Sequence, residues 1–452
     1  MVRLDWPRIY REAGATLRLA SPLILGQLSA MGMNVVDALL AGHMSATILA
    51  AVAVGASVWT LVIVMIIGVL MALPPSVSQL EGAGERHLIG SLFRQALWLA
   101  LGLGMLLLVA VRMLGRPLIM ALQVDEEIIG DALDFLQAIS YGAPALALYF
   151  ALRGLSEGTG NTRPTMYFGF LGLLLLIPLG YSLMYGKVEG ISGAFGLGAA
   201  TAIVLWIQFL SLLTYICLHP HYRIYRLFAH LEGPNVSSIA SLLTLGIPMG
   251  VALLLEASLF VIAALLIAAL GAIEVASHQV ALSIASVAFM LPLGLAMAIT
   301  VRVGHAVGRG DPSGVRYAGY TGIAMTLVTQ TLSAALMTFF PEFIVGLYTS
   351  DPKVTVLALK LLALAALFQF SDGIQVAANG ALRGLKDTKR PMLITLIAYW
   401  GVGMPIGYLL AFRQKWGAPG MWVGLIAGLS VAALLLFARF YRRVRVDQVI
   451  LA

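Results

Sequence analysis

Residues 242–270 read LLTLGIPMGVALLLEASLFVIAALLIAAL, an apolar run with a single carboxylate, Glu256, near its middle. At about 1.5 Å of rise per residue, a helix of this length crosses a hydrocarbon core of roughly 30 Å. A charge at that depth costs at least ~2.5–3.5 kcal/mol on membrane-insertion scales. Glu256 is therefore expected to face a cavity and to serve function. The alternative is a protonated carboxyl that is hydrogen-bonded in a helix bundle for packing alone.

The composition of the whole chain predicts a multispan helical membrane protein. Of its 452 residues, 60% are hydrophobic and only 11% are charged, whereas soluble domains carry about 25% charged residues. The net charge of +7 comes from basic residues scattered between apolar runs, which favours a topogenic role over nucleic-acid binding. The N-terminus lacks a cleavable-signal pattern, and Cys217, the single cysteine, excludes an intrachain disulfide.

Apolar runs of spanning length recur about twelve times along the chain. We expect these spans at residues 15–40, 48–79, 92–111, 129–153, 162–186, 191–218, 236–270, 275–308, 314–340, 355–383, 392–413 and 417–437. With a cytoplasmic N-terminus, the inside segments hold 21 basic residues and the outside segments 7, which accounts for all 28. The positive-inside rule therefore predicts that both termini are cytoplasmic.

The two halves of the chain repeat one design. Adding 226 to the residue number aligns residues 22–84 with residues 248–310 without a gap. The matches include Pro22 with Pro248, Gly68 with Gly294, ALRGL at 151–155 with 381–385, and IPLGY at 177–181 with MPIGY at 404–408. Six spans per half keep both copies in one orientation, so we expect an all-α membrane protein of twelve helices in two pseudo-symmetric six-helix lobes. The expected lobes are residues 1–230 and 231–452, with substrate bound between them.

Polar residues share one face of the first predicted span. Gln27, Asn34 and Asp37 follow spacings of seven and three, which place them on the same side of a helix. Gln27 and Asn34 are candidates for a polar substrate-binding surface. Asp37 is a candidate ion-coupling residue at or near membrane depth; the alternative is a solvated acid at the outer end of the helix.

A second polar stripe interrupts the tenth predicted span. Its members are Gln369, Asp372, Gln375 and Asn379, which lie within one broad helical face. The three amides, Gln369, Gln375 and Asn379, are further candidates for a polar substrate-binding surface. Apolar residues extend well to both sides of Asp372, so solvation at a helix end does not explain it. Asp372 is therefore the second candidate for ion coupling after Glu256, with packing alone as the alternative.

Prolines interrupt the first span of each half. Pro22 and Pro248 each remove one backbone hydrogen bond and bend the helix that contains them. We interpret both as hinges, and the alternative is a pair of static kinks.

Several chemistries are excluded by the motifs that the sequence lacks. No G-x-x-x-x-G-K-[ST] loop occurs, so the chain is not an ATPase. No H-E-x-x-H or paired-cysteine spacing occurs, and His278 and His305 are isolated. We expect no enzymatic site, no structural metal and no cofactor.

Three segments carry a family resemblance. They are SPLILGQLSAMGMNVVDALLAGHM at 21–44, HQVALSIASVAFMLPLGLAMAITVRVGHAVGRG at 278–310, and ALRGLKDTKRP at 381–391. In these segments, and over nearly its full length, the chain resembles the multidrug and toxic compound extrusion family, most closely its bacterial NorM-type branch. The resemblance implies twelve helices in two six-helix lobes around a central cleft, and export of cationic, lipophilic compounds in exchange for H+ or Na+.

The family's membrane acids map onto Asp37, Glu256 and Asp372, the same three carboxylates that depth and spacing single out. One departure concerns the proline of the fifth span. Relatives often carry asparagines around it, whereas Leu176 and Gly180 flank Pro178 here. This departure counts against a polar ion site in the N-terminal lobe.

The resulting hypothesis is a cation-coupled multidrug antiporter of the bacterial inner membrane. Glu256 and Asp372 would form its ion site for H+ or Na+, with Asp37 as a secondary candidate. Its expected partners are cationic drugs, dyes and membrane lipid, without nucleic acid, and the protein is expected to be monomeric. Two alternatives remain: a lipid-linked precursor flippase, which would need a strongly cationic cavity, and an ion channel, which would need a continuous filter. The sequence leaves the coupling ion, its stoichiometry and the drug spectrum open.

Overall fold

The computed structural model describes residues 5–121, 125–187, 190–230 and 232–445, and these residues form long helices. The outermost residues of the two predicted lobes, 1–4, 231 and 446–452, lie outside the described residues. Among the described residues, eleven helices are long and apolar enough to cross a membrane. The number is twelve when α5 and α6, which are bent by 46° relative to each other, count as one span. The predicted all-helical membrane architecture is confirmed.

The helices of the first half follow one another through short turns. They are α1 (Trp6–Met44), α2 (Ala46–Leu70), α3 (Leu73–Ala83), α4 (Arg86–Ala121), α5 (Glu126–Ser140), α6 (Ala143–Gly158), α7 (Arg163–Met184), α8 (Gly193–Leu218) and the short α9 (Pro220–Arg223).

The second half has the same order of spans, but the spans are interrupted at different places. Its helices are α10 (Val236–Ala268), α11 (Ala272–Gly308), α12 (Pro312–Phe339), α13 (Pro341–Gly346), α14 (Pro352–Gly384), α15 (Lys389–Leu396), η1 (Ile397–Gly403), α16 (Met404–Tyr408), η2 (Leu409–Arg413) and α17 (Ala418–Arg445). The segments η1 and η2 are π-helical, so the eleventh span alternates between α- and π-helical turns. Such π-helical turns are rare and often occur at functional sites.

Side-chain caps and left-handed glycines set the helix ends. The Ser45 hydroxyl accepts a hydrogen bond from the Ile48 amide at 3.0 Å and begins α2, and the Asp311 carboxylate does the same for the Gly314 amide at 2.8 Å at the start of α12. Gly84 and Gly310, which the 226-residue shift makes equivalent, have φ angles of 77° and 63°. A residue with a side chain is strained there, so the repeat preserves the turn geometry as well as the helices.

Packing divides the chain into two compact units. One consists of residues 25–250, and the other of residues 1–24 together with 251–452. The two boundaries are themselves 226 residues apart and lie two residues after Pro22 and Pro248. These units differ from the sequence lobes 1–230 and 231–452 at two helices. The first half of α1 packs with the unit of residues 251–452, and the first half of α10 packs with the unit of residues 25–250. Each of these two continuous helices therefore joins the units at its internal proline.

In the unit of residues 25–250, the first half of α10 packs closely on α2. A Cβ atom on Gly68 would overlap the backbone of Gly250, and one on Gly246 would overlap the backbone of Val69. Small residues at such positions let helix backbones approach each other in a membrane, where no hydrophobic effect drives helix association.

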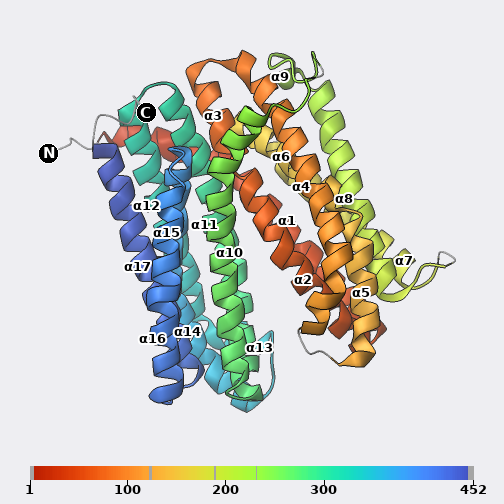
Figure 1. Cartoon of the computed structure of the whole chain (residues 1–452). Helices are drawn as coiled ribbons and strands as arrows, with labels where there is room; N and C mark the ends of the chain where they lie inside the picture. The colour runs from red at the N-terminus through yellow and green to blue at the C-terminus, as the bar shows by residue number, and fades with distance from the viewer. Residues whose placement is uncertain (1–4, 122–124, 188–189, 231, 446–452) are drawn as a thin grey trace. The chain divides into compact units, whose positions relative to one another are not determined.

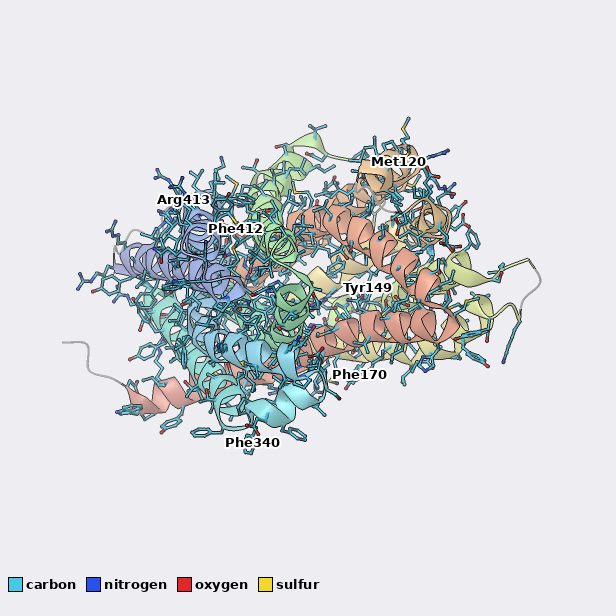
Figure 2. All side chains as sticks on the ribbon, turned by 90° about the horizontal axis from the view of Figure 1, so that it is seen from below. Met120, Tyr149, Phe170, Phe340, Phe412 and Arg413 are labelled. Atoms are coloured by element: carbon cyan, nitrogen blue, oxygen red, sulfur yellow. The ribbon has the colours of Figure 1, made fainter. Side chains whose placement is uncertain are left out.

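The unit that contains the C-terminus is built around α14, which packs against α11, α12 and α17. These helices run side by side in Figure 1, from the teal α12 to the blue α17. Trp422 and Tyr399 are among the largest fully buried side chains of its core. Large apolar side chains also lie on the outside: Phe340 after α12 and Met120 in α4 are 58% and 55% exposed and project outward in Figure 2. Such a surface suits contact with lipid.

Ion pairs attach the first half of α1 to this same unit. Arg8 donates to Asp311 at 3.1 Å and to Ser313 at 2.9 Å, and Arg302 donates to Glu12 at 2.5 Å. These contacts join the start of α1 to the second half of the chain, and the buried Ala20 and Leu23 pack against Leu295 and Ala298 of α11.

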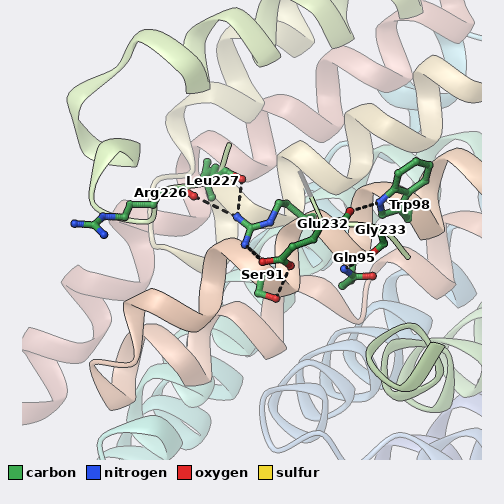
Figure 3. A network of polar contacts seen from close by, with 8 residues as sticks. Ser91, Gln95, Trp98, Arg226, Leu227, Glu232 and Gly233 are labelled. Carbon is green, nitrogen blue, oxygen red and sulfur yellow. Dashed lines mark hydrogen bonds and ion pairs between the residues drawn. The ribbon is translucent and has the colours of Figure 1, made fainter. Parts of the chain in front are cut away.

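The connector before α10 is attached to α4 in the other unit. Arg94 forms an ion pair with Glu232 and donates to the Leu227 carbonyl at 2.9 Å, while Trp98 donates to the Glu232 carbonyl at 2.9 Å (Figure 3). Gln95 accepts a hydrogen bond from the Asn235 amide at 2.6 Å. These bonds hold the start of α10 against residues of the first half.

Candidate functional site

Glu256 lies on the second half of α10, within the unit built around α14. Its side chain is half-buried, and it interacts electrostatically with Arg383 and Asp372 of α14. The structure therefore brings together the two carboxylates that the sequence ranked highest. No Lys or Arg lies within two helical turns of Glu256 in the sequence, and Arg383 comes from another helix.

Asp372 is buried with 2% of its surface exposed. One helical turn further along α14, the buried Gln375 donates a hydrogen bond from Nε2 to the Tyr399 hydroxyl at 2.6 Å. Tyr399 belongs to the π-helical segment η1, is fully buried, and lies within electrostatic range of both carboxylates. The site thus combines two carboxylates, a guanidinium and a phenol from α10, α14 and η1.

The other members of the α14 stripe have different environments. The fully buried Gln369 accepts a hydrogen bond from Gln330 of α12 at 2.7 Å between the two amides, which fastens α14 to α12. Asn379 is half-buried. The Oε1 atom of Gln375 is buried and accepts no hydrogen bond from the described residues. Of the predicted stripe, Gln375 is therefore the member that continues the polar environment of Asp372.

The three predicted residues of α1 do not converge. Gln27 accepts a hydrogen bond from Arg153 of α6 at 2.9 Å, and Asn34 is exposed. Asp37 interacts with the Thr201 side chain of α8, while its Oδ1 atom is buried and has no hydrogen-bond partner among the described residues. Ten residues of helix, about 15 Å of axial rise, separate Gln27 from Asp37. Asp37 is partly buried, so it is not a fully solvated acid at a helix end.

A buried ion pair beside Gln27 was missed by the sequence reasoning. Arg153 and Glu157 of α6 are 7% and 3% exposed, and the Arg153 Nε atom donates to Glu157 at 2.5 Å. Thr165 donates a second hydrogen bond to the same Glu157 oxygen at 3.1 Å. The repeated ALRGL motif was the available signal, because it makes Arg153 and Arg383 equivalent and places an arginine beside the polar site of each half.

One of the two isolated histidines, His278, packs in the helix core. His278 is fully buried in α11, and its Nδ1 atom accepts a hydrogen bond from the Trp422 indole at 3.1 Å. In the part of the chain that the structure describes, no group of three His, Cys, Asp or Glu side chains is arranged to hold a metal ion.

Comparison with known proteins gives the family. The MatE family model matches residues 22–182 and 248–409, which are the two repeats. The chain belongs to the MatE family. Its members are transporters, so this chain is not an enzyme.

Relatives of this family cover nearly the whole chain. The chain is 48% identical over 438 residues to the "Probable multidrug resistance protein NorM" of Xanthomonas campestris. The aligned region covers 96% of this chain and 95% of that protein. It is 43% identical to the "Multidrug resistance protein PmpM" of Pseudomonas aeruginosa, over 97% of this chain and 93% of that protein.

A solved structure described as the "outward-facing conformation of a multidrug resistance MATE family transporter of the MOP superfamily" has a TM-score of 0.89. Its sequence identity is 18%, over 97% of each chain. It supports the MatE fold alone.

Proposed function

We propose that this MatE protein is a secondary active multidrug efflux antiporter that exports cationic, lipophilic compounds in exchange for H+ or Na+. The observation that carries the proposal is the shared environment of Glu256 and Asp372, two carboxylates from separate membrane helices in one packing unit. The printed names of its relatives, which are multidrug resistance proteins, support the substrate class.

The charges of the cluster define its chemistry. Two carboxylates in a medium of low dielectric constant repel each other, and Arg383 offsets one of the two negative charges. One uncompensated negative charge then matches one monovalent cation, either H+ or Na+. The Tyr399 phenol and the Gln375 amide supply neutral oxygens beside the carboxylates, which Na+ would require.

Exchange follows from competition for this negative charge. A cationic drug is favoured by ionised carboxylates, and an entering H+ or Na+ removes that charge and weakens drug binding. By thermodynamic linkage the drug weakens ion binding by the same factor, a coupling that is typically ~1–3 kcal/mol. The ion gradient therefore drives drug release. Asp37 is proposed as a secondary ion-coupling site in the other unit. The proposed polar contacts for substrate are Gln27, Asn34, Gln369, Gln375 and Asn379.

We further propose that Pro22 and Pro248 are the hinges of the exchange cycle. Both lie two residues before the point at which their helix passes from one packing unit to the other. A helix that lacks a hydrogen bond at this point bends at lower cost than an intact one.

The proposed setting is the bacterial inner membrane, with both termini cytoplasmic and the protein acting as a monomer without a cofactor. The distribution of basic residues supports the orientation. A lipid-linked precursor flippase is disfavoured because the cluster carries two acids against one arginine. An ion channel is disfavoured because paired repeats joined by hinged helices suit alternating access.

Dye efflux from vesicles that contain the purified protein tests the proposal. A pH gradient and a Na+ gradient are imposed separately, with a cationic dye inside. We expect saturable efflux with at least one gradient, and identification of that gradient gives the coupling ion. Ion currents without saturable dye movement would favour a channel instead.

A further inference from the structure

One buried carboxylate gathers basic side chains at the end of α17. Asp387, in the turn between α14 and α15, is 7% exposed. Its Oδ2 atom accepts from Arg439 at 2.7 Å and from Arg443 at 3.2 Å, both on α17. Because two guanidiniums share one carboxylate, the charge around Asp387 stays positive.

The surrounding residues add to this positive charge. Segments 386–390 and 439–447 contain seven basic and two acidic residues. The basic cluster is defined here as the Lys and Arg residues of 386–390 and 439–445. Four of its members are exposed and form no ion pair with any described residue: Lys389, Arg390, Arg442 and Arg445.

The basic cluster lies where membrane helices end, which is the depth of lipid headgroups. α15 begins within it and α17 ends within it, and both belong to membrane spans. The Arg445 guanidinium lies over the Tyr441 ring at 4.6 Å, and Tyr441 is 38% exposed, as expected of an aromatic residue at a membrane interface. Leu434 and Phe437, one to two turns earlier on α17, are exposed apolar residues that an acyl chain would cover.

Lys386 is a less solvated member of the cluster. Burial lowers the pKa of its side chain, because the ammonium ion has lost part of its hydration. An anion nearby would compensate for that loss. The site is therefore better matched to an anionic ligand than a fully hydrated set of surface lysines would be.

The other repeat provides an internal comparison. With the shift of 227 that aligns IPLGY with MPIGY, the four α17 arginines fall on α8 residues of other types: Leu212, Tyr215, Ile216 and Leu218. Glu157, the counterpart of Asp387 in the ALRGL alignment, pairs with Arg153 of its own helix. The basic cluster is therefore specific to the second repeat and is not a consequence of the shared fold.

We propose that the basic cluster binds the phosphate headgroup of an anionic phospholipid, with the acyl chains along Leu434 and Phe437. Clusters of four to eight Lys or Arg residues directly beside a membrane helix are typical of anionic lipid recognition. This site is separate from Glu256 and Asp372, and it does not depend on the coupling ion or on the drug.

The test measures binding of phosphatidylglycerol and phosphatidylcholine with identical acyl chains to the purified full-length protein in detergent. Native mass spectrometry counts the retained lipid over a concentration series and at two NaCl concentrations. The variant Arg442→Gln/Arg445→Gln removes two exposed charges of the cluster. The matched control, Arg223→Gln/Arg309→Gln, removes two exposed arginines elsewhere, and Arg442→Lys/Arg445→Lys keeps the charge of the cluster.

We expect the wild type to retain phosphatidylglycerol in preference to phosphatidylcholine, less so at high salt. At roughly 1 kcal/mol for each basic residue, the two Gln substitutions should weaken phosphatidylglycerol binding about 30-fold. The control and the Lys variant should bind as the wild type does.

Three results would overturn the proposal. Equal retention of both lipids would show that the headgroup charge is not recognised. An equal loss in the Arg223→Gln/Arg309→Gln control would assign the effect to net charge. Displacement of the lipid by free glycerol phosphate at equal concentration would identify a soluble phosphate site instead.

Discussion

Removing Arg153 should destabilise the unit of residues 25–250 more than any exposed arginine does. Arg153 and Glu157 are almost fully buried, and the guanidinium also donates to Gln27 of α1. In Arg153→Met, the Glu157 carboxylate keeps the Thr165 hydrogen bond at 3.1 Å but loses its counter-ion. Breaking a buried pair from one side costs about 3–5 kcal/mol. For a unit of this size, that lowers the melting temperature by about 6–20 °C.

The assay is thermal unfolding of the purified protein in detergent. The double variant Arg153→Met/Glu157→Met should recover most of the loss, because replacing both partners of a buried pair with apolar side chains is often neutral. Arg116→Met, an exposed arginine of α4, is the control and should shift the melting temperature by about 2 °C or less. The reasoning would be refuted if Arg153→Met were as stable as Arg116→Met, or if Arg153→Met/Glu157→Met were less stable than Arg153→Met.

Two further predictions concern the hinge and the orientation. Pro22→Ala restores a backbone donor in α1 and should slow dye turnover while leaving dye affinity largely unchanged; wild-type turnover at normal expression would rule out the hinge. In a Cys217→Ala background, an impermeant thiol reagent added outside whole cells should label His43→Cys and leave His230→Cys unlabelled. Labelling of His230→Cys would reverse the proposed topology.

Helix positions were predictable from the sequence because the signal is local. An apolar run of about 20 residues must form a helix in a membrane, since every backbone polar group has to be satisfied within the segment. Eleven of the twelve predicted runs coincide with described helices or helix pairs, and the eleventh run coincides with the consecutive α- and π-helical segments from α15 to η2. The bend between α5 and α6 and the π-helical turns η1 and η2 were not predicted, because apolar composition does not report backbone geometry.

Carboxylates of the site were predictable because a charge at membrane depth stands out in an apolar run. Their partners were harder to predict. Arg383 lies near the end of α14 and reads as a topogenic residue, and Tyr399 reads as an ordinary aromatic residue of a span. Both become part of the site only when α10, α14 and η1 are packed together. The packing of the first half of α1 with the second half of the chain was also not predictable from local sequence. It involves contacts between residues that are far apart in the chain, such as Arg302 with Glu12.

The central claim is that Glu256 and Asp372 couple ion binding to drug binding, and dye affinity measured across pH and Na+ concentration tests it most directly. The measurement uses the purified wild type, Glu256→Gln, Asp372→Asn and, as control, Glu342→Gln, an exposed acid of α13 in the same unit. In the wild type and the control, dye affinity should fall by about 5–150-fold as the coupling ion saturates the site. In Glu256→Gln and Asp372→Asn this dependence should flatten. Both variants retaining the wild-type ion dependence would contradict the account.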